Sequence, residues 1–217
     1  MMPEIDYDGN IKLKTILIGR SGVGKTNLIN IAKNIAFNPV EESSVASSFF
    51  KTEMIIDNHQ FNIYLWDTVG QEKLRSVANV FFKNSKLVIL VYDITNRDSL
   101  EELSYWHKQV KDTLGSNIVL GVLANKQDLY LNEEVSDEEG QKYAESIGAR
   151  WGITSAKTQR DSFITFIEDL VRDYMNLINP NKKEEKEKQK EGENNNNNIK
   201  LNKKNSKKRV FAFCPCH

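Results

Sequence analysis

Hydrophobic residues recur along the chain in patterns that predict six β-strands. Two runs, residues 86–94 and 117–124, are apolar almost without a break, and residues 11–19 alternate before they become continuously apolar; both patterns are typical of strands buried in a parallel sheet. The segments FFKTEMII and QFNIYLWD flank the turn DNH at 57–59, which predicts a β-hairpin. A further short strand is expected near residues 150–153.

Between these strands, apolar residues repeat with helical spacing. Helices are predicted in NLINIAKNIAF (27–37), in 99–114 with Ser99 or Asp98 as the N-cap, in 136–148, and in 159–178. Strands that alternate with helices predict a three-layer α/β fold. We expect a six-stranded, mostly parallel sheet with one antiparallel edge strand and with helices on both faces.

Composition divides the chain into a folded body and a polar tail. The 217 residues carry 30 basic and 30 acidic side chains, but residues 1–179 have a net charge of −6 and residues 180–217 a net charge of +6. After Pro180, KKEEKEKQKEGENNNNN has too few apolar residues to form a core. We therefore expect a flexible leader at 1–10, one globular domain at 11–179, and a disordered tail at 180–217.

The cellular compartment is also suggested by composition. No apolar run approaches the ~20 residues of a membrane span, and the acidic N-terminus is unlike a secretory signal. No cysteine precedes Cys214, so no disulfide is expected within the body, which favours a reducing compartment.

The glycine-rich stretch GRSGVGKT, residues 19–26, matches the G-x-x-x-x-G-K-T phosphate-binding motif between a predicted strand and a predicted helix. Its backbone amides can surround a phosphate, Lys25 can reach terminal phosphates, and the Thr26 hydroxyl can bind Mg²⁺. The fold is then a P-loop NTPase fold. Phosphate contacts are expected from Ser21, Gly22, Val23, Gly24, Lys25, Thr26 and Asn27. This loop alone does not distinguish adenine from guanine, or a kinase from a GTPase.

Two later loops favour guanine. Asn125-Lys126-Gln127-Asp128 follows a buried strand, and the Asp128 carboxylate can accept from both the N1–H and the 2-amino group of guanine, a pair that adenine lacks. Taken alone, NKQD could be an ordinary polar loop. Ser155-Ala156-Lys157 follows the next strand, where a backbone N–H could meet the guanine O6.

The stretch Asp67-Thr68-Val69-Gly70-Gln71 supplies candidate metal and catalytic groups. Asp67 ends a strand near the phosphate loop and can hold Mg²⁺ through water. The Gly70 amide can approach a γ-phosphate, and the neutral side chain of Gln71 can orient an attacking water.

GRSGVGKT, WDTVGQE, NKQD and TSAK, in this order and at these separations, resemble the small GTPases of the Ras superfamily over residues 10–178. The Rab branch is most similar, because Phe49, Trp66 and Phe81 occupy its aromatic positions. The resemblance implies binding of GTP and GDP with Mg²⁺, slow GTP hydrolysis, and two switch segments at 36–50 and 68–83. By the same resemblance, Ser44 takes the place of the Mg²⁺-binding threonine of the first switch.

The resemblance also implies a setting and partners. These are vesicle trafficking, an exchange factor, a GTPase-activating protein, effectors and a prenyl-chaperone similar to GDI. The terminal Cys214 and Cys216 resemble a doubly prenylated Rab terminus, and two lipid chains give the stable anchoring that one does not. A monomer is expected at the cytoplasmic face of intracellular membranes, with a cytosolic pool. Interleaved acids and few aromatics in the tail argue against nucleic acid.

Departures from the family pattern leave alternatives open. Ser44 lacks a methyl group of threonine, and Val69 replaces the usual alanine beside Gly70. These changes motivate a second hypothesis, a membrane-bound nucleotide scaffold that hydrolyses GTP weakly. A small P-loop kinase is a third, although it leaves NKQD unexplained. Ile153, where an acidic residue is common, casts little doubt on the base site.

Overall fold

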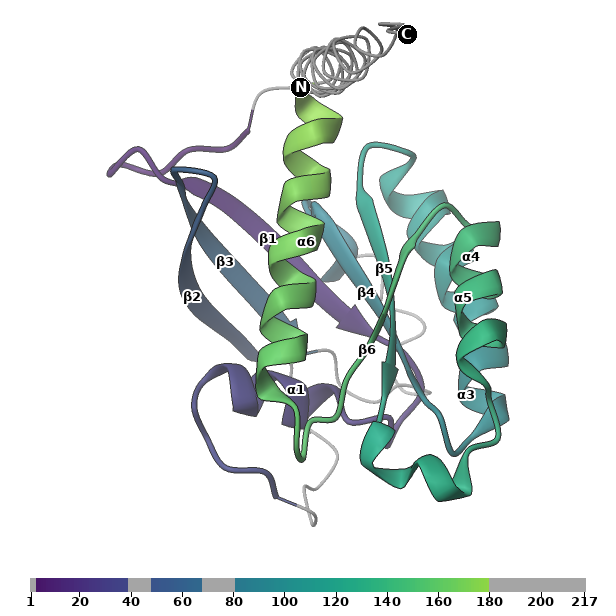
Figure 1. Cartoon of the computed structure of the whole chain (residues 1–217). Helices are drawn as coiled ribbons and strands as arrows, with labels where there is room; N and C mark the ends of the chain where they lie inside the picture. Colours follow the sequence, from purple (N-terminus) through teal and green to yellow (C-terminus); the bar gives the residue numbers. More distant parts are fainter. Residues whose placement is uncertain (1–2, 39–47, 68–80, 180–217) are drawn as a thin grey trace, which may run out of the picture. The chain divides into compact units, whose positions relative to one another are not determined.

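The computed structural model describes residues 3–38, 48–67 and 81–179. In these residues six strands form one sheet in the order β2-β3-β1-β4-β5-β6 (Figure 1). The strands are β1 (Ile11–Ile18), β2 (Ser48–Ile56), β3 (His59–Asp67), β4 (Leu87–Asp93), β5 (Val119–Asn125) and β6 (Arg150–Ile153). The helices are α1 (Lys25–Ala32), α3 (Arg97–Glu101), α4 (Leu103–Leu114), α5 (Asp137–Ser146) and α6 (Arg160–Ile178), with a 3₁₀ helix, η1, at Gln127–Asn132.

The strand pairing confirms the predicted sheet. β2 and β3 pair antiparallel at one edge, while every other pair of neighbouring strands is parallel. The hairpin turns at Asp57 and Asn58, which have φ values of 49° and 63°. Two consecutive residues with positive φ give the turn twist that suits a two-residue hairpin, and Asp and Asn tolerate it better than most residues.

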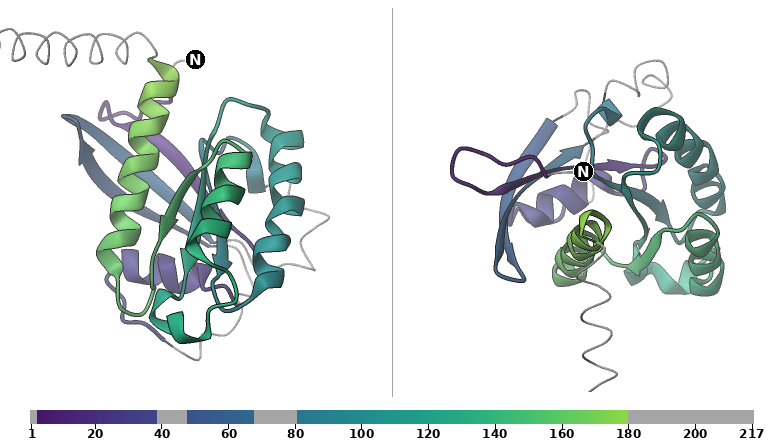
Figure 2. Two further views of the ribbon diagram at one scale, coloured as in Figure 1. Left: turned by 45° about the vertical axis from the view of Figure 1, so that its right-hand side comes forward. Right: turned by 90° about the horizontal axis from the view of Figure 1, so that it is seen from above.

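Helices cover both faces of the sheet, as predicted (Figures 1 and 2). β1 illustrates why, since its side chains alternate between two separate cores. Leu13 and Leu17 belong to the core that contains residues of α1 and α6, whereas Ile16 and Ile18 belong to the core that contains residues of α4 and α5. This double burial is the physical reason why the end of β1 is continuously apolar.

Two predicted helices differ from the structure. The helix predicted at 99–114 is divided into α3 and α4, and its N-cap is Asn96, not Ser99 or Asp98. The Asn96 side chain accepts a hydrogen bond from the Ser99 amide, which satisfies a free N–H of the first turn. The helix predicted at 27–37 is shorter, because α1 ends at Ala32 and Asn34 has a φ of 61°.

Residues 3–10, where the sequence predicts a flexible leader, contain a hydrogen-bonded turn. The Asp6 carboxylate accepts from the amides of Asp8 (3.0 Å) and Asn10 (2.9 Å), and Ile5 forms an isolated antiparallel bridge with Ile11. The chain divides into units of residues 1–178 and 179–217, of which the second is described only at Asn179. The predicted domain boundaries and the disorder of the tail stay predictions.

None of the helices in residues 3–38, 48–67 and 81–179 is both long enough and apolar enough to span a bilayer.

Candidate functional site

The candidate site lies at the carboxyl edge of the sheet, where parallel strands end side by side. The pairing aligns Leu17 with Asp67, and Asp93 with Asn125. The glycine-rich loop follows β1, η1 follows β5, and TSAK follows β6. Because loops at the carboxyl ends of parallel strands form the ligand crevice of open α/β sheets, the register brings the predicted phosphate and base residues to one edge.

Glycines allow the predicted phosphate loop to pack closely against its neighbours. A Cβ on Gly19, which has a φ of 149°, would lie only 2.1 Å from the Val91 carbonyl oxygen. A Cβ on Gly24 would lie 2.3 Å from Asn125 Nδ2, and Gly24 has a φ of 98° directly before α1. Any side chain at these two positions would displace β4 or the base loop, so glycine is required there.

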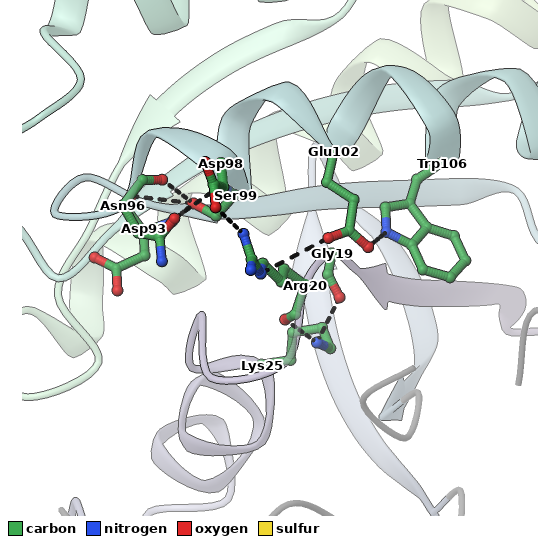
Figure 3. Close-up of polar contacts among 9 residues, drawn as sticks. All are labelled: Gly19, Arg20, Lys25, Asp93, Asn96, Asp98, Ser99, Glu102 and Trp106. Carbon is green, nitrogen blue, oxygen red and sulfur yellow. Dashed lines mark hydrogen bonds and ion pairs between the residues drawn. The ribbon is translucent and has the colours of Figure 1, made fainter. Parts of the chain in front are cut away.

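Lys25 is buried at the start of α1, with 5% of its surface exposed. Its Nζ donates to the main-chain oxygens of Gly19 and Arg20, each at 2.8 Å, so the ammonium group lies inside the curve of the loop (Figure 3). Burial lowers the pKa of Lys25 from 10.5 to about 8, and the charge of Asp67 partly opposes that change. Lys25 is therefore a cation at neutral pH, as the binding of a phosphate oxygen requires.

Thr26 and Asp67 place two oxygen donors together beside the loop. The Thr26 hydroxyl donates to Asp67 Oδ2 at 2.8 Å, and Asp67 is 2% exposed. Hydroxyl and carboxylate oxygens are ligand types that Mg²⁺ prefers, so the chemistry of this pair fits a magnesium ion.

Asn125 joins the phosphate loop to the two base loops. Its side chain is 1% exposed, its Nδ2 donates to the Val23 carbonyl at 2.7 Å, and its Oδ1 accepts from the Ala156 amide at 3.1 Å. Three segments distant in sequence are thus held by one amide group. The Ala156 amide, one of those predicted to meet guanine, donates to Asn125 here, and its contact with a base stays a prediction.

The two remaining residues of the predicted base motif are fixed by ionic contacts. Lys126 has a left-handed backbone with a φ of 69°, and its Nζ lies 2.6 Å from Asp93 Oδ2. The Asp128 carboxylate accepts from the Ser155 hydroxyl at 2.5 Å and lies 3.8 Å from Lys157 Nζ. A carboxylate held in this way is oriented before any ligand arrives, which suits recognition of two neighbouring N–H donors.

Two residues at the site were missed by the sequence prediction. Asp93 ends the apolar strand β4 and accepts from the amide and hydroxyl of Thr95 as well as pairing with Lys126. A charged residue that ends a buried strand at the ligand edge was the available signal. Arg20 lies inside the motif at a position that the pattern leaves open, so no sequence signal pointed to its contacts.

The structure describes only part of the predicted site. Among the predicted phosphate residues, Val23 is buried, Ser21 is exposed, and the Asn27 side chain exchanges hydrogen bonds with the main chain of Asn38. Five predicted residues lie outside the described ranges: Ser44, Gly70, Gln71, Cys214 and Cys216.

Comparison with known proteins agrees with this geometry. The model of the Ras family matches residues 14–176. The Ras-related protein Rab-21 of Homo sapiens is 36% identical over 160 residues, covering 74% of this chain and 69% of the relative. Rab-21 of Geodia cydonium is 34% identical over 158 residues, with 73% and 69% covered. The GTP-binding protein ypt3 of Schizosaccharomyces pombe (strain 972 / ATCC 24843) is 32% identical over 179 residues, with 81% and 83% covered.

The matched region contains every described residue of the candidate site and most of the sheet. Members of this family bind GTP and hydrolyse it to GDP and phosphate, and those of the Rab group act in vesicle trafficking. The chain belongs to the Ras family of small GTPases, within its Rab group.

Proposed function

We propose that this chain binds GDP and GTP with its phosphates in the loop around Lys25 and its guanine base against Asp128. The observation that supports this most is the double hydrogen bond of Asn125, which ties the Val23 carbonyl to the Ala156 amide. A polar side chain buried between two loops that have no structural need to touch is well explained if one ligand spans both loops. The ligand must then have an anionic end and a base with paired N–H donors.

We also propose that Thr26 and Asp67 hold Mg²⁺ together with Ser44, whose place rests on the family resemblance. When bound, the ion neutralises charge on the phosphate oxygens. Lys25 adds a second positive charge within the loop. The amides around Gly22 and Gly24 supply further donors at the start of α1, where the helix dipole favours an anion.

Gln71 is our candidate for the residue that orients the attacking water, with Gly70 beside the γ-phosphate. Both assignments rest on the motif DTVGQ and on the family. We expect slow hydrolysis by the chain alone, because in this family much of the rate, typically a factor of ~10³–10⁵, comes from an arginine that a GTPase-activating protein donates. Replacing Gln71 by Leu should lower single-turnover hydrolysis of bound GTP while leaving its binding intact. If the wild type and Gln71→Leu hydrolysed GTP equally weakly in the presence of an activator, the scaffold alternative would be favoured.

Cys214 and Cys216 are proposed as sites of prenylation that anchor the chain to the cytoplasmic face of intracellular membranes. Two lipid chains give the two signals that stable binding requires, and the basic tail adds attraction to anionic lipids. Exchange factors, effectors and a GDI-like chaperone are the proposed partners. Mass spectrometry of membrane-purified protein tests this proposal, and an unmodified tail in that fraction would contradict it.

Base selection is tested by exchanging Asp128 for Asn. The wild-type protein should prefer GDP to ADP by several orders of magnitude in competition binding. Asp128→Asn replaces an acceptor by a donor, so it should lose GDP and gain XDP, because xanthine has a carbonyl where guanine has its 2-amino group. Asp137→Asn, in the acidic first turn of α5, is the matched control and should leave the preference for guanine unchanged. Equal binding of GDP and ADP by the wild type would refute the proposed function.

A further inference from the structure

Arg20 makes two different connections from one position in the phosphate loop. Its main-chain oxygen accepts a hydrogen bond from Lys25 Nζ at 2.8 Å. Its side chain extends to the beginning of the α3–α4 segment, where Nη1 lies 2.8 Å from Asp98 Oδ2 and Nε lies 3.9 Å from Glu102 Oε2 (Figure 3). One of the two residues whose main-chain oxygens hold the buried ammonium group therefore also ties the loop to a helix.

The helix end that receives Arg20 is itself firmly held. The Ser99 hydroxyl accepts from the Asp93 amide at 3.0 Å and donates to the Asn96 carbonyl at 2.6 Å. Glu102 Oε1 accepts from Trp106 Nε1 at 3.2 Å, and the Glu102 side chain is 22% exposed. These contacts hold the main chain at the start of α3 and orient the Glu102 carboxylate, while the exposed Asp98 carboxylate pairs with Arg20 itself.

This helix end is also connected to the base loop. Asp93, whose main chain is bonded to Ser99, pairs through its carboxylate with Lys126 of NKQD. A continuous set of contacts thus runs from Lys126 through Asp93 and Ser99 to α3, and from Asp98 of α3 to Arg20.

We propose that Arg20 is a positioning residue that fastens the phosphate loop to α3 and thereby slows the release of nucleotide. The inference rests on the proposed function, since it assumes that Lys25 and the loop hold phosphate. Pairing of Arg20 with Asp98 restrains the Arg20 carbonyl, and that carbonyl helps to set the place of Lys25 Nζ. When the pair is lost, the loop between Gly19 and Gly24 can open more often, because its glycines provide little restraint of their own.

The expected effect is modest. Arg20 and Asp98 are 40% and 71% exposed, and exposed ion pairs contribute little to global stability. Their effect should instead appear in the loop that they restrain. We expect Arg20→Ala to accelerate dissociation of fluorescently labelled GDP about threefold at saturating Mg²⁺.

Charge pairing can be separated from other effects by a double-mutant cycle. Asp98→Ala should accelerate dissociation by a similar factor, although Asp98 lies on α3. The double variant should be no faster than the faster single variant, and Arg20→Lys should restore most of the wild-type rate. Multiplicative effects in the double variant, or no rescue by lysine, would overturn the proposal.

Arg97 provides a matched control on the same helix. Its guanidinium is similarly exposed and pairs with Glu139 at 2.9 Å, but it has no contact with the phosphate loop in the described part of the chain. Arg97 bonds both carboxylate oxygens of Glu139 and the Glu134 carbonyl, so Arg97→Ala should lower the melting temperature at least as much as Arg20→Ala does, with an unchanged GDP dissociation rate. If Arg20→Ala and Arg97→Ala accelerated GDP dissociation equally, the effect of Arg20 would be one of general stability, and the positioning role would be refuted.

The same measurement separates this inference from the function on which it rests. Wild-type protein that fails to bind labelled GDP would contradict the proposed function. Wild-type protein that binds GDP tightly, with Arg20→Ala releasing it at the same rate, would contradict only the role of Arg20.

Discussion

Replacing Asn125 by Ala tests the connection between the phosphate loop and the base loops. The substitution removes the Nδ2 group that donates to the Val23 carbonyl and the Oδ1 atom that accepts from the Ala156 amide. Both partners are buried, since Val23 is 1% exposed and Ala156 is 5% exposed. Each buried main-chain group left without a partner costs about 1–3 kcal/mol, and we expect Asn125→Ala to lower the free energy of unfolding by about 2–4 kcal/mol. A domain of typical stability, ~5–15 kcal/mol, would still fold.

The same substitution should accelerate release of GDP. If half of this destabilisation acts only on the nucleotide-bound form, the bound form loses about 1–2 kcal/mol relative to the free form. That loss corresponds to about 5- to 30-fold faster dissociation of GDP. Urea denaturation of the GDP-bound protein gives the stability change, and fluorescence of labelled GDP after mixing with excess unlabelled GDP gives the rate.

Asn62 offers a matched control for both measurements. It is also 1% exposed, but it lies in β3 and donates to Asp6 of the N-terminal turn. Asn62→Ala should lower stability by about 1 kcal/mol, the cost of one hydrogen bond, with no change in GDP release. If Asn62→Ala and Asn125→Ala accelerated release equally, faster release would follow from lost stability alone, and the bridging role of Asn125 would be refuted.

Three further predictions concern charge and packing. Burial lowers the pKa of Lys25 from 10.5 to about 8, so between these pH values the unfolded state binds more protons than the folded state. The free energy of unfolding of the nucleotide-free protein should therefore rise by about 3 kcal/mol from pH 8 to pH 10.5, relative to the Lys25→Met variant. Urea denaturation at each pH measures this change. The pairing of Glu139 with Arg97 lowers the Glu139 pKa from 4.5 to about 2. The stabilisation of the fold by ionised Glu139 should therefore be full above about pH 5 and disappear as pH falls through 2. The difference in melting temperature between the wild type and Glu139→Gln measures it. In Gly140→Ala the new Cβ would lie 2.1 Å from the Tyr92 hydroxyl oxygen, so the substitution should destabilise the protein by about 1–3 kcal/mol although alanine is the better helix former; greater thermal stability would refute this.

The sheet could be predicted from the sequence because its signal is local. A strand buried on both faces needs an apolar residue at nearly every position, and all seven residues of β4 are buried. The hairpin at 57–59 and the loop from Gly19 to Thr26 are also local, since each is defined by consecutive residues with special backbone preferences. The motifs could therefore be assigned to one edge before any contact was known.

The missed features have two different causes, of which the first is distance along the chain. Arg20 and Asp98 are 78 positions apart, and nothing near Arg20 in the sequence indicates which carboxylate it meets. The division between α3 and α4 was missed for a different, local reason. The apolar spacing at 99–114 is helical throughout, whereas the actual N-cap at Asn96 lies before the first apolar residue of that pattern. Helix periodicity reports the buried face, and it does not report where hydrogen bonding begins or is interrupted.

Backbone strain in the described residues is informative about where function lies. Positive φ occurs at five non-glycine residues there: Asn34, Asp57, Asn58, Asn84 and Lys126. Asn and Asp adopt this conformation at little cost, but for lysine it costs about 1–2 kcal/mol. A glycine or asparagine at position 126 would relieve that cost and would also lose the ion pair with Asp93, whose side chain is only 9% exposed. The protein therefore retains a strained residue whose side chain is needed, and the strain falls in the loop that we propose selects guanine.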